Sequence, residues 1–512
     1  MTGRTLGLGI FLSSLLFTAV AAAAPAVTLS QAAGPPTATV KVSGTGFGAF
    51  AAVDVYFDQT NMCLTFANAL GNANCEIKVP KTAQPQTHWF SILQRSNSSG
   101  AQKSFIVRAD WAQFHGNDAR HNGYNRFENT IGKDNAVNLD ILWTAAIGPT
   151  GTWSTPVIAN NRVYIGGRDG KLYAFNATTG APIAGFPRTL GGAVEHSTAA
   201  VGNGNVYIGT GAGDSKLYAF NANTGTPVPG FPKQLLNAVY SSPVLALGNV
   251  YVGDFNGNLW AFNATTGVVL PGFPVGVFGG IFGSPTISGG RLYISTNNSR
   301  IYAFDAMTGS PNTIDSVIVG ASISSIAAAN GQVYGASTGL NGEQILYGLD
   351  RNLEFDTTYF PIGLGTTPGF NYSTPAVVGA TIFVGKPATS VSAFRFNAGS
   401  SALWTRNFIN PTQGSPVVAN GLVFVNATKT LFALDASNGT ILWSSAVRTA
   451  EFASPAVVNG IVYIGSTDGF LYAYSENGEP PSARLAGGEL GVKSALSGLK
   501  PDLRLKALRT RD

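Results

Sequence analysis

The stretch "KLYAFNATTGAPIAGFP" at residues 171–187 is written again as "KLYAFNANTGTPVPGFP" at 216–232 and as "NLWAFNATTGVVLPGFP" at 258–274. A phrase repeated at a fixed spacing has to be tested as a structural repeat before it is interpreted as a site. A second motif, "STPV" or a relative of it, keeps the same spacing. It marks eight positions, separated by 43, 44, 42, 41, 49, 41 and 39 residues: Pro156, Ala199, Pro243, Pro285, Ile326, Pro375, Pro416 and Pro455.

Each repeat contains the pattern of four short strands. In the first, an apolar run ("TPVIA") is followed by an alternating run ("RVYIG"), a turn ("RDG"), a further run ("KLYAFN") and a short final segment. Asp-Gly supplies the backbone conformation that a tight hairpin needs. Four antiparallel strands every 40 to 45 residues are typical of a β-propeller blade. The sequence therefore predicts an all-β protein with an eight-bladed β-propeller, in which the repeated phrase is a building unit.

The eighth repeat stops after "FLYAYSENGEPP" without a fourth strand. Upstream of the first repeat, "AVNLDILWTAAIG" at residues 136–148 has the apolar spacing of an outer strand. We predict that this segment completes the last blade. It would tie the two ends of the ring together and remove a sheet edge that otherwise invites aggregation.

Composition agrees with this fold and excludes some partners. The chain has 63 Gly and 27 Pro, and only 11% of its residues are charged. The formal net charge is +5, and the main body contains no run of Lys or Arg, so nucleic acid is not an expected partner. The final segment, 479–512, is mildly basic and is predicted to be a partly disordered tail.

The first 24 residues have the features of a cleavable signal peptide: Arg4, an apolar run from Leu6 to Val20, and small residues after it. No other segment approaches the roughly 18 apolar residues that cross a bilayer. We therefore expect a periplasmic or extracellular protein without a membrane span.

Residues 25–109 lack the repeat. Alternating runs such as "TATVKVSGTGF" and "SFIVRAD" predict a small β-sandwich. "GTGF" at 44–47, followed by "VDVYF", is similar to bacterial immunoglobulin-like modules that precede secreted domains. The only two cysteines, Cys63 and Cys75, are predicted to form a disulfide in an oxidising compartment. The propeller is then assigned to residues 110–478.

The repeats resemble a known family. "ALDASNGTILW" at 433–443 resembles the tryptophan-docking motif of eight-bladed propellers related to pyrroloquinoline quinone dehydrogenases, and "WAQFHGNDARHNGYN" at 111–125 is similar to their lead-in segment. The resemblance covers 110–478. Blades one to three depart from the motif by replacing its Trp with Gly-Phe-Pro, at Phe186, Phe231 and Phe273, so some docking contacts must be remade.

The resemblance also implies chemistry. Enzymes of that family hold the quinone against a disulfide between adjacent cysteines and over a Trp, and they bind calcium through Glu, Asn and Asp oxygens. The propeller region of this chain has no cysteine. We therefore expect no cofactor, no metal and no catalytic residue, with pyrroloquinoline quinone plus calcium as the alternative. Relatives include an outer-membrane assembly lipoprotein that acts as a scaffold.

Two groups of side chains are candidate sites. His115, Asp118 and His121 lie close together, but their spacing fits no standard zinc pattern, so structural capping is expected. We call the position of Pro156 and its equivalents in the other repeats the register mark. Three residues before it, six of the eight repeats carry an aromatic residue or His: Trp153, His196, Tyr240, Phe282, Tyr372 and Phe452. These would either ring the channel mouth and stack on a ligand or wedge between blades as packing.

Together these features predict a secreted, monomeric binding or scaffold protein that engages a protein or a glycan through a propeller face. An enzyme with its site at the channel is the alternative. Acidic and Asn side chains converging on the channel would favour the enzyme. An aromatic and largely uncharged mouth would favour binding.

Overall fold

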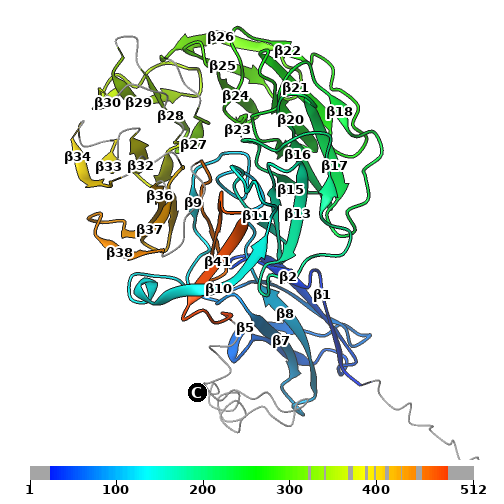
Figure 1. Cartoon of the computed structure of the whole chain (residues 1–512). Helices are drawn as coiled ribbons and strands as arrows, with labels where there is room; N and C mark the ends of the chain where they lie inside the picture. The colour runs from blue at the N-terminus through cyan, green and yellow to red at the C-terminus, as the bar shows by residue number, and fades with distance from the viewer. Residues whose placement is uncertain are drawn as a thin grey trace, which may run out of the picture.

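The protein is described by a computed structural model, shown in Figure 1. It describes residues 24–320, 324–338, 342–366, 373–386, 390–396, 399, 401–409, 414–427, 429–445 and 452–481. Within these ranges the only helix is a single 3-10 turn, η1 (Ala136–Asn138). None of the described helical structure is long and apolar enough to cross a membrane. The predicted signal peptide and nearly all of the predicted tail lie outside these residues.

Eight sheets of at least four antiparallel strands are arranged around a central axis, which confirms the predicted eight-bladed propeller (Figure 1). Blade one consists of β11 (Val157–Ala159), β12 (Arg162–Gly166), β13 (Lys171–Asn176) and β14 (Arg188–Thr189), and blade two of β15 (Ala200–Gly202), β16 (Asn205–Gly209), β17 (Lys216–Asn221) and β18 (Lys233–Gln234). Blade three consists of β19 (Val244–Ala246), β20 (Asn249–Gly253), β21 (Asn258–Asn263) and β22 (Val275–Gly276), and blade four of β23 (Thr286–Ser288), β24 (Arg291–Ser295), β25 (Arg300–Asp305) and β26 (Pro311–Ile318).

Blades five to eight continue in the same way. Blade five consists of β27 (Ala327–Ala329), β28 (Gln332–Thr338), β29 (Gln344–Asp350) and β30 (Ile362–Gly365), and blade six of β31 (Ala376–Val378), β32 (Thr381–Lys386), β33 (Ser390–Arg395) and β34 (Ala402–Asn407). Blade seven consists of β35 (Val417–Ala419), β36 (Leu422–Ala427), β37 (Thr430–Asp435) and β38 (Ile441–Ser444), with β9 (Tyr124–Asn125) added beside β35. Blade eight consists of β39 (Ala456–Val458), β40 (Ile461–Gly465), β41 (Phe470–Glu476) and β10 (Leu139–Ala146).

The ring closes as the sequence predicted. Strand β10 pairs antiparallel with β41, with Leu139 opposite Glu476 and Ala146 opposite Phe470. The last blade therefore takes its outer strand from the segment that precedes the first blade. This arrangement leaves no open edge between the ends of the ring, where two unpaired strands would otherwise meet water.

The core lies between neighbouring blades because both faces of each central strand are apolar. One cluster combines Tyr164 of blade one with Val206 and Ile208 of blade two. Packing of sheet on sheet around the ring buries these side chains almost completely.

Tyrosines of the second strands contact the next blade at junctions with and without a docking tryptophan. At the junction of blades eight and one, Tyr463 and Trp143 both donate to the carbonyl of Ala177 at 3.0 Å. In blades one to three, the hydroxyls of Tyr164, Tyr207 and Tyr251 donate to the carbonyls of Ala222, Ala264 and Ala306 in the next blade, at 2.7, 2.5 and 2.8 Å. In blade six, where Phe383 stands in place of the Tyr, the indole N–H of Trp404 donates to the carbonyl of Ala436 at 3.0 Å. At each of these junctions an aromatic donor therefore satisfies the equivalent carbonyl of the next blade.

The N-terminal strands form a two-sheet β-sandwich. One sheet has the order β1-β3-β6 and the other β2-β8-β7-β4-β5. Their bounds are β1 (Ala26–Leu29), β2 (Ala33–Gly34), β3 (Thr39–Thr45), β4 (Ala52–Phe57), β5 (Thr60–Phe66), β6 (Ala73–Lys78), β7 (Thr87–Gln94) and β8 (Gly100–Val107). The sheets enclose a core that includes Val42, Phe90 and Phe105. We refer to this unit as the module; its immunoglobulin-like character stays a prediction.

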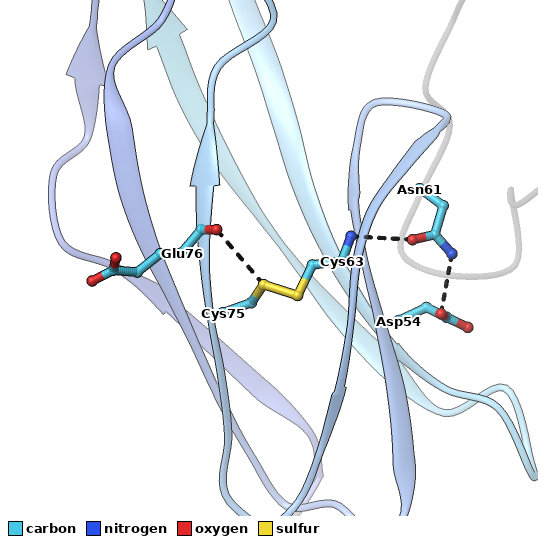
Figure 2. Close-up of a disulfide and its surroundings, with 5 residues drawn as sticks. All are labelled: Asp54, Asn61, Cys63, Cys75 and Glu76. Carbon is cyan, nitrogen blue, oxygen red and sulfur yellow. Dashed lines mark hydrogen bonds between the residues drawn. A yellow bond between two sulfur atoms is a disulfide. The ribbon is translucent and has the colours of Figure 1, made fainter.

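The predicted disulfide links the edges of the two sheets. Cys63 on β5 is bonded to Cys75 on β6, at a sequence separation of 12 (Figure 2). Asn61 fixes the β5 side, because its side chain accepts from the Cys63 backbone N–H at 3.2 Å and donates to Asp54 at 3.0 Å (Figure 2). The bond therefore fastens one sheet to the other where no ladder hydrogen bonds run between β5 and β6.

Removing this bond is expected to destabilise the module alone. Closing a loop of this length restricts the unfolded chain by about 3 kcal/mol. In the double variant Cys63→Ala/Cys75→Ala we expect the amides of β5 and β6 to lose hydrogen-exchange protection. The propeller strands of the same molecule serve as the internal control. Unchanged protection in β5 and β6 would contradict the expectation.

The module is attached to one face of the propeller by defined contacts. Arg108 donates to the side chain of Asn160 at 2.8 Å, and the side chain of Asn459 exchanges two hydrogen bonds with the backbone of Ala109. Asn160 and Asn459 lie in turns between the first and second strands of their blades. We call this side of the propeller the module face and the opposite side, where the innermost strands begin, the aromatic face.

Candidate functional site

Five of the six predicted ligand residues lie in the described part of the chain and converge on the propeller axis. Trp153, His196, Tyr240, Phe282 and Phe452 each precede the innermost strand of a different blade. We call these five residues the aromatic cluster. Tyr372 lies outside the described residues, as do Ile323 and Gln413 of the same register.

His196 is the centre of the aromatic cluster. Its ring centroid lies 4.8 Å from Phe282, 5.0 Å from Phe452, 5.1 Å from Trp153 and 5.8 Å from Tyr240. The residues therefore pack against one another across the axis. They also line the cavity on the axis, and their binding of a ligand stays a prediction.

Two opposite charges border the aromatic cluster. The guanidinium carbon of Arg168 lies 4.0 Å from the Trp153 ring centre, a cation–π geometry. Burial, followed by the Arg168 charge, lowers the pKa of His196 to about 4. Burial, followed by the Glu195 carboxylate, raises the pKa of Tyr240. His196 is therefore neutral at physiological pH.

This lowered pKa predicts acid sensitivity. An exposed His has a pKa near 6.5, so His196 in the unfolded chain is protonated below that pH. In the folded protein His196 stays neutral down to about pH 4. The free energy of unfolding is therefore unaffected by this group above pH ~6.5, and it falls by on the order of 3 kcal/mol as the pH is lowered toward 4. Denaturant unfolding of His196→Phe, which keeps an aromatic ring, is expected to show a smaller loss between these pH values. Tyr240→Phe is the control and should keep the wild-type pH dependence; an unchanged dependence in His196→Phe would contradict the assignment.

Below the aromatic cluster lies a ring of hydroxyl side chains that the sequence reasoning missed. At seven junctions, the backbone N–H of the residue before the register mark donates to a hydroxyl of the next blade at 2.8–3.2 Å. The residues are Thr155, Thr198, Ser242, Ser284, Ser325, Thr374, Ser415 and Ser454. The signal was available, because Ser or Thr occupies this position in all eight repeats.

The lead-in segment, residues 111–125, closes the axis on the module side. It bonds to the second residue of the innermost strand in every blade, in blade order. The strand partners are Ile158, Val201, Leu245, Ile287, Ala328, Val377, Val418 and Val457, at 2.7–2.8 Å. Because the innermost strand is a sheet edge, the segment satisfies backbone groups that would otherwise be unpaired.

His115 and His121 belong to this closure. Both are fully buried. The ring nitrogens of His115 lie 2.8 and 2.7 Å from the carbonyl oxygens of His121 and Pro416, and burial lowers its pKa. Asp118 forms an ion pair with Arg120 at the surface. Among the described residues no cluster of three His, Cys, Asp or Glu side chains could hold a metal ion.

A cavity of about 60 Å³ remains on the axis, between the aromatic cluster and Phe114 of the lead-in segment. It is lined by aromatic side chains, His196 and the hydroxyl ring, and the described residues that line it include no Asp, Glu or Asn. Sites for small ligands usually measure roughly 300–1,000 Å³. Both cysteines are bonded to each other in the module. This cavity therefore does not fit a quinone cofactor with calcium.

Around the closed axis, the aromatic face exposes large apolar side chains. Phe278 and Ile409 are 76% and 96% exposed. Leu236, Phe255 and Ile318 lie on the same face, and Phe255 contacts Tyr240 with ring centroids 5.3 Å apart. The strand connections that carry these residues all lead to or from the ends of strands nearest the aromatic cluster.

Comparisons with known proteins agree with this architecture. BamB from Moraxella catarrhalis superposes with a TM-score of 0.53 at 17% identity, over 66% of this chain and 97% of that chain. The quinohemoprotein alcohol dehydrogenase from Comamonas testosteroni gives 0.59 at 17% identity, over 72% and 81%. A europium-containing methanol dehydrogenase gives 0.55 at 14% identity, over 72% and 98%. At these identities the likeness concerns the fold.

No curated protein sequence matches the chain. The profile of a sequence family described as outer membrane protein assembly factor BamB matches residues 135–352 and 364–481. The match begins just before β10 and extends through the last blade, so it covers more than half of the chain and leaves out the module. The chain is therefore a member of the BamB-like propeller family.

Proposed function

We propose that this chain is a secreted binding or scaffold protein that engages another protein through the aromatic face of its propeller. The observation that carries the proposal is the combination of a closed axis with exposed apolar side chains around it. A cavity of about 60 Å³ suits water, whereas Leu236, Phe255 and Phe278 expose apolar side chains on the connections in and beside blade three. Several large apolar side chains exposed on neighbouring connections indicate an interaction site, whereas single scattered ones do not.

A protein partner is favoured over a glycan by the position of the aromatic rings. Sugar binding needs a ring face open for stacking, but the rings of the aromatic cluster are occupied by one another. The exposed residues include aliphatic side chains such as Leu236 and Ile409, which suit the apolar centre of a protein interface. The family name is consistent with such a role, since it describes an assembly factor.

Site-specific photocrosslinking tests the proposal. A photoreactive amino acid placed at Phe278 on the aromatic face is expected to yield a discrete protein adduct in cells that produce the chain. The matched control is Val268, which is 64% exposed but lies in the connection between β21 and β22 on the module face. Adducts of the same size from both positions, or from neither, would contradict the proposal.

Calorimetric titration with pyrroloquinoline quinone and calcium tests the enzymatic alternative. We expect no saturable heat, because none of the described residues that line the axial cavity carries an acidic or amide oxygen. Saturable binding, followed by dye-linked oxidation of an alcohol, would instead support a quinoprotein.

A further inference from the structure

The end of the module that points away from the propeller carries an unusual surface. Three turns meet there, at residues 46–51, 66–72 and 95–99, which we call the module tip. The contacts with the propeller come from the opposite end of the sandwich: Gln84 lies before β7, and Arg108 follows β8. Figure 1 shows the module projecting from the propeller, so the module tip is free of it.

The module tip exposes three large apolar side chains. Phe50 is 72% exposed, Phe66 64% and Leu70 82%. Leu64, on the neighbouring strand β5, is 46% exposed. Scattered apolar residues on a surface need no explanation, but several on adjoining turns form a patch that does.

Hydrogen bonds hold these turns in one arrangement. The backbone N–H of Ala67 donates to the carbonyl of Ala51 at 2.9 Å, which joins the neighbours of Phe66 and Phe50. The N–H of Phe47 donates to the carbonyl of Gly71 at 3.2 Å, which joins the same two turns again. The apolar side chains are therefore presented by a rigid base.

Phe50 adopts a backbone conformation that glycine or asparagine normally occupies. It has φ +57° in a turn closed by the bond from the Ala51 N–H to the Gly48 carbonyl at 3.1 Å. A bulky residue in this region costs local energy. The fold thus holds an aromatic side chain outward at a position where a smaller residue would be more stable.

The patch carries no charge. Residues 42–53 and 64–75 contain no Asp, Glu, Lys, Arg or His. The nearest charged side chain of the third turn, Arg95, is held by the carboxylate of Asp54 at 2.7 Å. A surface without ionised groups enters an apolar medium without the large cost of removing charges from water.

The size of the patch favours a lipid surface over a protein. The two Phe rings, at 150–250 Å² each, expose roughly 200–340 Å², well below the ~800 Å² per partner of a stable protein interface. Single side chains of this kind do insert into the interfacial region of a bilayer.

We propose that the module tip docks on a lipid bilayer by inserting Phe50, Phe66 and Leu70, and so holds the propeller at a membrane surface. The proposal concerns a different part of the chain from the propeller face and does not depend on its partner. Because the two turns that carry Phe50, Phe66 and Leu70 contain no charged residue, the attraction is apolar and is not screened by salt.

Flotation with phosphatidylcholine vesicles tests it. The mature protein is expected to float with the vesicles at low and at high salt. The variant Phe50→Ser/Phe66→Ser/Leu70→Ser should reduce the bound fraction about tenfold or more, since each lost side chain removes an apolar contact. Equal thermal unfolding midpoints for wild type and variant would show that the variant is folded and that the reduced flotation reflects lost membrane binding.

A matched control separates this proposal from the proposed function. Phe278→Ser/Ile409→Ser removes two equally exposed apolar side chains from the aromatic face and should leave flotation unchanged. Three results would overturn the proposal: wild type that stays with the soluble fraction, equal flotation of the tip variant and wild type, or a lipid-free dimer that the tip variant abolishes in sedimentation. Binding only to anionic vesicles at low salt would also overturn it, because it would indicate a charged surface.

Discussion

Trp143→Ala is expected to lower the free energy of unfolding by about 3–5 kcal/mol, the range for removing a large buried aromatic side chain. Trp143 is 8% exposed and lies on β10, the strand that closes the ring. Its indole N–H donates to the carbonyl of Ala177 in blade one at 3.0 Å, and its ring lies 5.8 Å from that of Tyr463. The substitution therefore leaves a cavity at the junction where both ends of the propeller meet.

The partner surface in blade one is shaped for this ring. Gly180 has φ +70°, and a Cβ built there would lie 2.8 Å from the indole. Trp143→Phe keeps part of the ring but loses the hydrogen bond, so an intermediate loss is expected. Thr144→Ala, on the exposed side of the same strand, is the control and should change stability by at most about 0.5 kcal/mol. Denaturant unfolding followed by circular dichroism measures all three, and a Trp143→Ala midpoint equal to that of Thr144→Ala would contradict the role given to Trp143.

The blade architecture was predictable from the sequence because it depends on local patterns. Alternating runs specify the hairpins, with Asp-Gly turns at Asp169-Gly170 and Asp468-Gly469 in the first and last blades, and the spacing of Pro156 and its equivalents repeats the hairpins eight times. The closing strand was also predictable, since the eighth repeat visibly lacked one and residues 136–148 had the matching pattern. These features require only neighbouring residues along the chain.

The arrangement at the axis was not predictable in the same way. Register alone placed Trp153, His196 and Phe452 near the channel, but it does not say whether the rings point outward, apart or across the axis. Their mutual contacts depend on the channel radius and on rotamers, which are properties of the closed ring. Ser or Thr at the same position of every repeat was visible in the sequence. That these hydroxyls accept hydrogen bonds from the backbone N–H groups of the preceding blade was not.

The path of the lead-in segment was the least visible feature. Its residues form almost no regular secondary structure, and β9 (Tyr124–Asn125) is its only strand. A segment that bonds to each of the eight blades in turn shows no periodicity of its own, because its partners are up to 332 residues away in the sequence. Sequence resemblance located the segment, whereas the hydrogen bonds explain why it is needed.

Gly123→Ala is expected to be the most damaging small substitution in this segment. Gly123 has φ +64°, and a Cβ there would lie 2.5 Å from the His115 ring and 2.7 Å from Ala376. A left-handed backbone costs an L-residue roughly 1–2 kcal/mol, and overpacking in a closed core adds about 1–3 kcal/mol. Together these give a loss of about 2–5 kcal/mol in denaturant unfolding. The clash displaces His115 and with it the contact to blade seven at Pro416.

The same segment offers a matched control. It separates the effect of disturbing the lead-in segment from the general effect of replacing a glycine. Gly116 lies seven residues earlier, and a Cβ there would meet only the backbone of Asp118, at 3.7 Å. Gly116→Ala should therefore leave the unfolding midpoint close to that of wild type. If the lead-in segment holds the eight innermost strands together, Gly123→Ala should also raise hydrogen exchange at Val377 and Val418, whose N–H groups bond to Asn122 and Gly123. Equal behaviour of the two alanine variants would mean that the segment lies on the axis without stabilising it.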